Sequence, residues 1–288
     1  SPELRKCYDM YPNLKIVFTG SSVMRLKEEN PELNNIVKSY NLRGFSFREF
    51  LNLKTGNHFR PYTLDEILRN HERIVKDILP KVSPLSFFQD YLHHGFYPFF
   101  QEQRNYSENL LKTMNMVTEV DILLIKQIEL KYLTKIKKLF YLLALEGSKA
   151  PNVSWLAQEI ETSRATVMNY IKYLADARLT NMIYPKGCEF PKKPSKVMMH
   201  NTNLMYAIYP IAVKRQDVME TFFVNTMWKD HNVNQGAKDD FYLVDGSLKF
   251  KICNANDFEK KKFRQDTIYA RYNTEVGNDN LIPLWLLG

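Results

Sequence analysis

The chain has 288 residues, of which 44% are hydrophobic and 13% are aromatic, so it is long enough to bury two or three compact cores. This composition excludes a disordered protein. The net charge of +8 and the sequence pI near 9.1 favour a polyanionic partner, because opposite charges attract over long range.

Two further classes of protein are excluded by what the sequence lacks. No window approaches the roughly 18 uncharged apolar residues of a membrane span, and the first twelve residues lack the apolar core of a signal peptide. We therefore expect a cytoplasmic location and no membrane partner. Cys7, Cys188 and Cys253 are far apart and odd in number, which indicates reduced thiols and no metal held by cysteine.

The first distinctive stretch is "LKIVFTGSS", which comes after a short predicted helix over residues 2–10. The apolar run Leu14–Phe18 predicts a parallel strand that is covered on both faces. A turn at the carboxyl end of such a strand can bind a phosphate or position a water, so Thr19 and Ser21 are candidate site residues. The alternative is that a serine of this turn caps a helix over residues 23–29.

The next hundred residues predict a helical subdomain. Ser46 is expected to cap a helix that carries three apolar side chains on one face. Further helices are predicted near residues 63–79 and 84–93. His93 and His94 are adjacent, so on a helix they point about 100° apart and do not share a metal ion.

The segment from residue 134 to residue 186, with the hairpin "TNMIYPKGCEFPKKPSKVMMHN" at its end, has the clearest local pattern. A helix, a short helix, a longer helix and two short strands follow one another, and this order predicts a winged helix-turn-helix. Such a unit binds duplex DNA by placing the start of its third helix in a major groove, with basic side chains of the hairpin on phosphates. A protein-docking role is the alternative. The candidate DNA-binding residues are Arg164, Thr166, Asn169, Lys172, Lys186, Lys192, Lys193 and Lys196.

The remaining segment predicts strands and helices in the order of the restriction-endonuclease-like fold. In that fold, an Asp on one strand and a Glu-x-Lys on the next hold a divalent metal and position a water. Asp240 is the candidate for the first acid. Lys251 and Cys253 stand where the second acid and the lysine are expected, so the nuclease site is predicted to be degenerate.

Blocks along nearly the whole chain resemble one known family. They include "YPNLKIVFTGSS", "YNLRGFSFREFLN", "PLSFFQDYLHHGFYPFF", "SRATVMNYIKYLADARL", "NTNLMYAI", "ETFFVN", "DFYLVDG" and "IPLWLLG". In this order they are similar to the carboxyl-terminal three-quarters of a bacterial family of AAA+ P-loop ATPases that has a DUF4143-like region and occurs in Bacteroides-type genomes. The resemblance identifies Leu14–Phe18 and its turn as sensor 1, which contacts the γ-phosphate or its attacking water in complete members.

Several family features are absent from this chain. No G-x-x-x-x-G-K-[ST] loop occurs, and no hydrophobic strand ends in Asp-Glu, so the phosphate cradle and the magnesium carboxylate are missing. Asn35 and Ile36 stand where family members carry an arginine. The resemblance implies ATP and magnesium as cofactors of a complete member, whereas we expect no cofactor and no ATP hydrolysis from this chain alone.

The expected fold is a multidomain α+β chain. We assign residues 1–51 to a remnant of an AAA+ α/β core and residues 52–130 to a helical lid. Residues 131–195 are assigned to the winged helix, and residues 196–288 to a nuclease-like, DUF4143-type domain that is expected to be inactive.

Two functional hypotheses follow. In the first, the chain is part of an AAA+ ATPase, and its expected partners are duplex DNA and a missing ATPase half or another protein. In the second, it is a non-enzymatic module that acts by binding DNA or a protein. The expected truncation of the ATPase half favours the first hypothesis, while the substitutions at positions 35, 36 and 251 favour the second.

Overall fold

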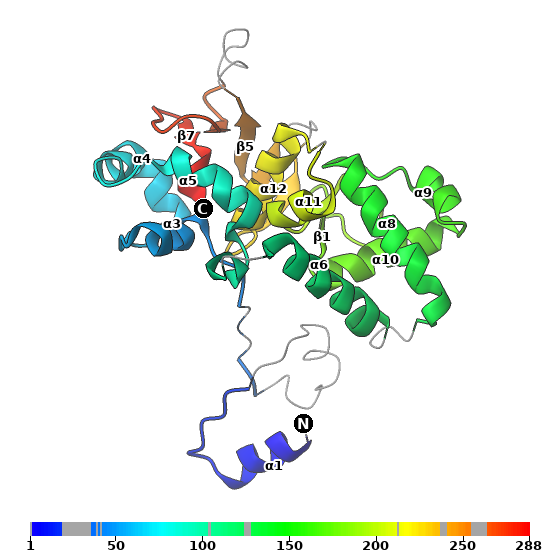
Figure 1. Ribbon diagram of the computed structural model, residues 1–288. Coiled ribbons are helices and arrows are strands. Elements are labelled where there is room, and N and C mark those ends of the chain that lie inside the picture. The colour runs from blue at the N-terminus through cyan, green and yellow to red at the C-terminus, as the bar shows by residue number, and fades with distance from the viewer. Residues whose placement is uncertain are drawn as a thin grey trace.

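The computed structural model shows a mixed α+β protein in which helices surround a five-stranded sheet and a separate hairpin (Figure 1). The structure describes residues 2–18, 36–38, 40, 42–102, 105–123, 128–211, 213–236, 241–254 and 264–288.

The amino-terminal arm lies apart from the other elements. Helix α1 (Pro2–Met10) has no buried residue and sits away from the main body at the bottom of Figure 1. The strand predicted for Leu14–Phe18 is not formed, because no described backbone segment pairs with it. Its apolar side chains are exposed, and Val17 is 91% exposed. Thr19 and Ser21 lie outside the described residues.

Two helices that follow the arm begin with matching caps. At α3 (Phe47–Thr55) the Ser46 side chain accepts from the Glu49 amide, and the Glu49 carboxylate accepts from the Ser46 amide, which confirms the predicted cap. Thr63 and Glu66 make the same reciprocal pair at α4 (Leu64–Ile78). Each pair satisfies amides that a helix leaves unpaired at its start.

Helix α5 (Pro84–Asp90) continues into a wider turn, η2 (Tyr91–Gly95), whose carbonyls are met by side chains from another helix. Asn203 on α11 (Thr202–Ile208) is fully buried and donates to the carbonyls of Tyr91 (3.0 Å) and Leu92 (2.8 Å). Its Oδ1 accepts from the Phe96 amide at 2.8 Å and from the Tyr106 hydroxyl. One carboxamide therefore joins segments that are about a hundred residues apart.

The next elements run in the order that the sequence predicts, with helices first and a hairpin last. Ser163 caps α10 by accepting from the Thr166 amide at 3.1 Å, and the buried face of α10 includes Val167, Ile171 and Leu174. An isolated bridge between Lys149 and the second hairpin strand adds a third short segment to the hairpin. The bounds are η3 (Pro98–Gln101), α6 (Tyr106–Met116), η4 (Val117–Ile122), η5 (Leu130–Tyr132), α8 (Leu133–Glu146), α9 (Val153–Glu159), α10 (Arg164–Asp176), β1 (Thr180–Ile183) and β2 (Lys196–Met199).

The hairpin crosses the boundary that we expect between residues 195 and 196. β2 pairs antiparallel with β1 along its whole length, from Thr180 opposite Met199 to Ile183 opposite Lys196. The second strand therefore belongs with the three helices before it.

The carboxyl-terminal part is a five-stranded sheet in the order β3-β4-β5-β6-β7. The first three strands are antiparallel neighbours, whereas β5, β6 and β7 are parallel. Helix α12 covers this sheet, and Phe223 contacts the rings of Tyr242 and Phe250. The bounds are α12 (Arg215–Met227), β3 (Val233–Gln235), β4 (Tyr242–Val244), β5 (Leu248–Cys253), β6 (Ile268–Arg271), β7 (Leu281–Pro283) and η7 (Leu284–Leu287).

We predict that Asn203→Ala lowers the free energy of unfolding by about 3 kcal/mol or more, because it removes the buried hydrogen bonds to the Phe96 amide and to the Tyr91 and Leu92 carbonyls. The exposed Asn169→Ala is the control, and it should change this free energy by about 0.5 kcal/mol at most. Chemical denaturation monitored by circular dichroism measures both values. Equal stability of the two variants would contradict this role of Asn203.

Candidate functional site

Helix α10 carries half of the predicted DNA-binding residues. Arg164 and Asn169 are exposed, and Lys172 is partly buried, on the side of the helix away from the core. Arg164 is the first helical residue after the cap, so it projects at the end of α10 where unpaired amides attract anions. The helix therefore presents a cationic and an amide side chain to solvent.

Two of the predicted residues on α10 already have partners within the helix. Lys172 forms an ion pair with Asp176, one turn further along. The Thr166 hydroxyl lies 2.9 Å from the Ser163 hydroxyl, as part of the cap. Since Asp176 neutralises Lys172, Arg164 is the predicted contact on this face that keeps an exposed, unneutralised charge among the described residues.

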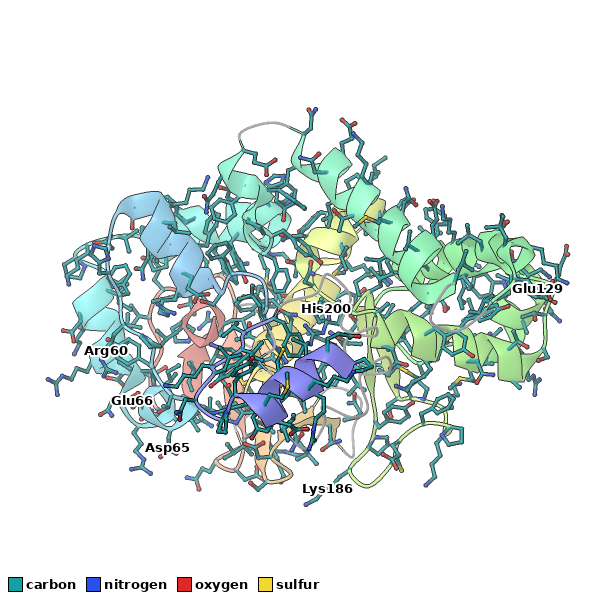
Figure 2. All side chains as sticks on the ribbon, turned by 90° about the horizontal axis from the view of Figure 1, so that it is seen from below. Arg60, Asp65, Glu66, Glu129, Lys186 and His200 are labelled. Atoms are coloured by element: carbon teal, nitrogen blue, oxygen red, sulfur yellow. The ribbon has the colours of Figure 1, made fainter. Side chains whose placement is uncertain are left out.

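The loop between β1 and β2 carries three exposed lysines, Lys186, Lys192 and Lys193. Lys186 lies at the lower edge of the molecule in Figure 2, and its Nζ donates to the Gly246 carbonyl at 3.3 Å. The Lys192 Nζ lies 3.9 Å from the Cys188 sulfur. Lys186 is thus held near the sheet, while Lys193 is exposed in the same loop.

The hairpin is also attached to the sheet through its backbone. The Gln235 amide donates to the Tyr184 carbonyl at 2.8 Å, and Asn234 Nδ2 approaches the same carbonyl at 3.4 Å. Pro185 and Gln235 form an isolated parallel bridge. The edge strand β3 therefore pairs with the start of the loop that carries the lysines. This contact restricts where those lysines can lie.

Lys196 is not available for phosphate contact, which corrects the sequence-based expectation. It is 7% exposed, and its Nζ donates to Glu220 Oε2 (2.7 Å) and to the Tyr242 hydroxyl (3.2 Å). The Tyr242 hydroxyl donates to the same carboxylate oxygen at 2.5 Å, and Gln216 Nε2 donates to Oε1 at 3.0 Å. A buried ammonium needs such partners, so the hairpin is joined to α12 and β4 here.

Burial in this cluster also changes neighbouring acid–base groups. Burial raises the pKa of the Tyr242 hydroxyl well above its usual value, and the Glu220 carboxylate raises it further. Burial likewise raises the pKa of Asp217, with a second contribution from Glu220. Tyr242 therefore stays protonated and acts as a hydrogen-bond donor to Glu220.

Two of the residues predicted for a degenerate nuclease site, Lys251 and Cys253, lie on β5. Asp240 lies outside the described residues. The Lys251 Nζ lies over the Phe241 ring, 5.1 Å from its centre, and the buried Cys253 thiol lies 3.9 Å from the Ala270 carbonyl. Within the described ranges, no three His, Cys, Asp or Glu side chains are grouped closely enough to hold a metal ion.

Glu220, the carboxylate at the centre of this buried cluster, was not identified from the sequence. It sits in the apolar run "METFFV" of α12, where a single acid among buried side chains signals a specific partner. Its partner, Lys196, is 24 residues earlier in a strand, and no local spacing connects the two positions.

His200, which follows β2 and is labelled in Figure 2, lies near the charges of Arg178 and Arg43. Its Nδ1 is 3.0 Å from Asn181 Oδ1. Burial, together with the nearby charges of Arg178 and Arg43, lowers the pKa of His200 to about 3. His200 is therefore neutral at physiological pH and adds no positive charge to the hairpin.

Comparisons with known proteins give partial matches. Residues 1–51 match an AAA domain, and residues 86–212 match a domain of unknown function, DUF8612. The chain is 28% identical over 190 residues to the uncharacterized protein MJ1637 of Methanocaldococcus jannaschii. That alignment covers 64% of this chain and 40% of the relative, so the chain spans less than half of that protein's length. No solved structure matches the chain.

The AAA-domain match supports the predicted relationship to AAA-type ATPases. The DUF4143-like part of the resemblance is not supported by these matches, since the central match is to a different domain. Among the described residues, no helix has the length and apolar character needed to cross a bilayer.

The ion pair between Lys196 and Glu220 generates a prediction about stability. Lys196→Met should lower the free energy of unfolding by about 3 to 5 kcal/mol, because it leaves a buried carboxylate without its cation. Adding Glu220→Leu to that variant should restore most of the loss. The exposed pair Arg69 and Asp65 is the control, and Arg69→Met should cost less than about 1 kcal/mol. Denaturant titration of all variants measures these differences, and equal losses at the two sites would refute the assignment.

Proposed function

We propose that this chain is the DNA-binding part of an AAA-type ATPase and that residues 131–199 form a winged helix-turn-helix. The observation that carries the proposal is the exposed face of α10, with Arg164 and Asn169 near its capped start. The exposed Lys192 and Lys193 of the following hairpin loop supply further positive charge. Helix start and basic loop are the two parts with which winged helices contact duplex DNA.

The arrangement of the elements supports this interpretation. Three helices are followed by an antiparallel hairpin, and α10 packs on β1. A bridge from Lys149, between α8 and α9, adds a short third strand to the hairpin at Val197. This order is typical of winged helices, in which the hairpin extends beside the third helix.

The expected DNA contact is mainly electrostatic. The net charge of +8 attracts a polyanion, and arginine and lysine side chains bind phosphates without regard to base sequence. Asn169 is the candidate for a base contact, because a carboxamide can form two hydrogen bonds with adenine. We therefore expect moderate sequence preference on top of strongly salt-dependent binding.

ATP hydrolysis is not assigned to this chain. The sequence has no phosphate-binding loop, so the residues present do not fit the triphosphate and its magnesium ion. We propose that the exposed apolar segment Leu14–Phe18 pairs as a strand with the parallel sheet of an AAA nucleotide-binding core. Support comes from the AAA-domain match over residues 1–51 and from the exposure of these apolar side chains.

We further propose that the carboxyl-terminal sheet has a nuclease-like fold without catalytic activity. Towards α12 the sheet presents Tyr242 and Phe250, and Glu220 on that helix is already paired with Lys196. An aromatic surface and a neutralised carboxylate do not fit a divalent metal.

A second candidate function is protein docking by the same α10 face. The pairing of Lys172 with Asp176 favours it, because this pair reduces the positive charge of the face. The two functions differ in how they respond to removal of Asp176. Loss of this carboxylate strengthens DNA binding by freeing Lys172. If the face instead binds a protein that contacts Asp176, the same loss does not strengthen DNA binding.

DNA binding is tested by titrating the full chain against a labelled duplex of about 20 base pairs at several salt concentrations. We predict salt-dependent binding, with Arg164→Glu weakening it across all sequences and reducing the salt slope by about 1. Lys172→Glu should also weaken binding across all sequences, with a smaller change of the salt slope, because Asp176 already neutralises this lysine. Asp176→Asn should tighten it. The matched control is Lys76→Glu, on the exposed side of α4, which changes the net charge by the same amount as Arg164→Glu. It should change the affinity for the duplex by no more than about twofold.

The outcomes separate the two functions. If the duplex remains unshifted by excess protein at low salt, the DNA proposal fails and the docking role is favoured. Equal weakening by Lys76→Glu and Arg164→Glu would mean that net charge alone drives binding and that α10 is not the interface.

A further inference from the structure

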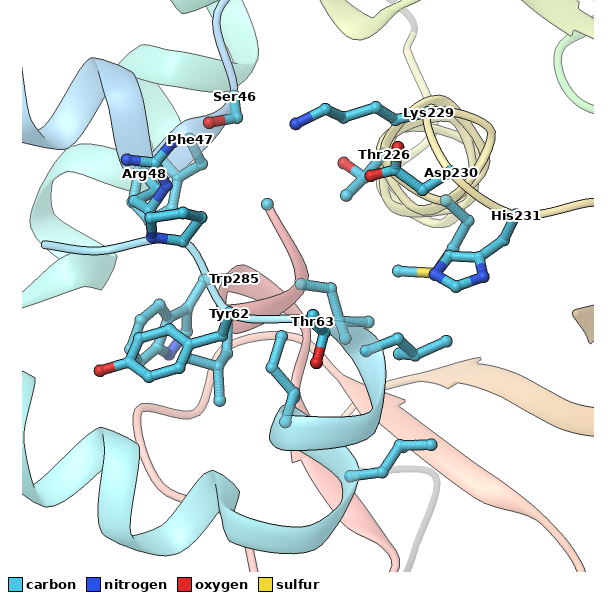
Figure 3. Close-up of a pocket in the computed structure, with 18 of the residues that line it drawn as sticks. Ser46, Phe47, Arg48, Tyr62, Thr63, Thr226, Lys229, Asp230, His231 and Trp285 are labelled. Atoms are coloured by element: carbon cyan, nitrogen blue, oxygen red, sulfur yellow. The ribbon is translucent and has the colours of Figure 1, made fainter.

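A pocket with a volume of about 540 Å³ lies on the opposite side of α12 from the hairpin, and nothing in the DNA-binding proposal uses it. Figure 3 shows its walls, which come from α3, the start of α4, the end of α12 and the carboxyl-terminal turn η7. Its volume falls within the range that small-molecule sites occupy in proteins. Segments from both ends of the sequence thus enclose one cavity.

The floor of the pocket is apolar and aromatic. Tyr62, Leu68, Leu248 and Trp285 line it, and Figure 3 labels Tyr62 and Trp285. Leu68 and Leu248 are only partly buried, so part of their surface faces the cavity. Such a surface favours an apolar ligand body, because covering it removes apolar area from water.

The rim of the pocket carries several charges, most of which are already paired. Arg48 contacts the Phe59 carbonyl (3.1 Å) and the Glu49 carboxylate (3.4 Å). Arg60 pairs with Glu66, and Asp65 pairs with Arg69. The Asp245 carboxylate lies 2.7 Å from His231 Nδ1. Each of these groups therefore already has a partner of opposite charge.

Lys229 differs from the other cations of the rim. Across the ranges that the structure describes, its Nζ has no hydrogen-bond or ion-pair partner, and in Figure 3 its side chain extends over the pocket towards Ser46. Asp230 also lines the rim, but its charge acts on Arg43, which bonds to the end of α12. Lys229 is therefore the group that a ligand anion would meet.

Trp285 supplies a second unsatisfied group. Its side chain is 4% exposed, and its indole Nε1 has no hydrogen-bond acceptor among the described residues. The nitrogen itself is buried, so Trp285 lines the pocket without offering this donor to a ligand. The pocket thus offers an apolar floor and an unpaired ammonium at its rim.

We propose that this pocket binds a small amphipathic anion, with an aromatic or aliphatic body on the Tyr62 and Trp285 side and its acidic group at Lys229. The ligand class follows from the Lys229 ammonium, which extends over the pocket without an ion-pair partner among the described residues, and from the apolar floor. The site is separate from α10 and the hairpin, so its test does not depend on DNA binding.

The probe is anilinonaphthalenesulfonate, an aromatic anion whose fluorescence rises in apolar surroundings, titrated into the native full chain. We expect saturable binding at one site, with the neutral analogue phenylnaphthylamine binding about tenfold more weakly. Lys229→Met should weaken binding of the anion about tenfold and leave the neutral analogue unchanged. The matched control Lys76→Met, on the exposed side of α4, should leave both affinities unchanged.

A second readout reports on the pocket wall directly. The three tryptophans give three indole N–H signals in a nitrogen–proton correlation spectrum, and Trp285→Phe identifies the one from Trp285. Addition of the anionic probe should move this signal more than the other two. Thr226→Trp, which places a larger side chain in the pocket, should weaken both probes, with thermal denaturation confirming that the variant is folded.

Three results would overturn the proposal. One is the absence of saturable binding of the anionic probe to the native chain. Another is equal affinity of Lys229→Met and Lys76→Met for that probe. The third is a Trp285 indole signal that does not move when the probe binds.

Discussion

The carboxamide of Asn203 is the contact on which most of the structure depends. It donates to the carbonyls of Tyr91 and Leu92 in the wider turn η2, and it accepts from the Phe96 amide. This fixes α11 against the helical part of the chain, and α11 leads directly into α12. Because α12 carries Glu220, the position of the buried ion pair with Lys196 follows from the same contact. The match to DUF8612 over residues 86–212 includes Asn203 and both carbonyls to which it donates.

The buried ion pair also fixes the position of the hairpin. Lys196 holds the second strand to α12 and β4, while Tyr184 bonds to Gln235 at the edge of the sheet. The exposed lysines of the loop therefore extend from a hairpin that is anchored on both strands. An anchored hairpin loses less conformational entropy on binding than a free one. The proposed DNA interface is to that extent preorganised by contacts far from the DNA.

The sequence was informative where a rule is local, and silent where a partner is distant. The 3.6-residue period of α10 predicted its buried side chains, and Ser46 was recognised as a cap from its position alone. The burial of Lys196 could not be predicted, because its partner Glu220 is reached only through the fold. The strand predicted for Leu14–Phe18 needs a neighbouring strand, and none of the described residues provides one. Asp240 and the sensor 1 turn lie outside the described residues and stay predictions.

The central claim, that α10 and the hairpin loop form one DNA-binding surface, is tested most directly by hydrogen exchange of the full chain with and without a duplex. The account predicts slower exchange of backbone amides in residues 163–172 and 184–195 when the duplex is bound, with no change in α4. Protection that is confined to other segments would contradict it. An unchanged exchange pattern when the protein is saturated with duplex would also contradict it.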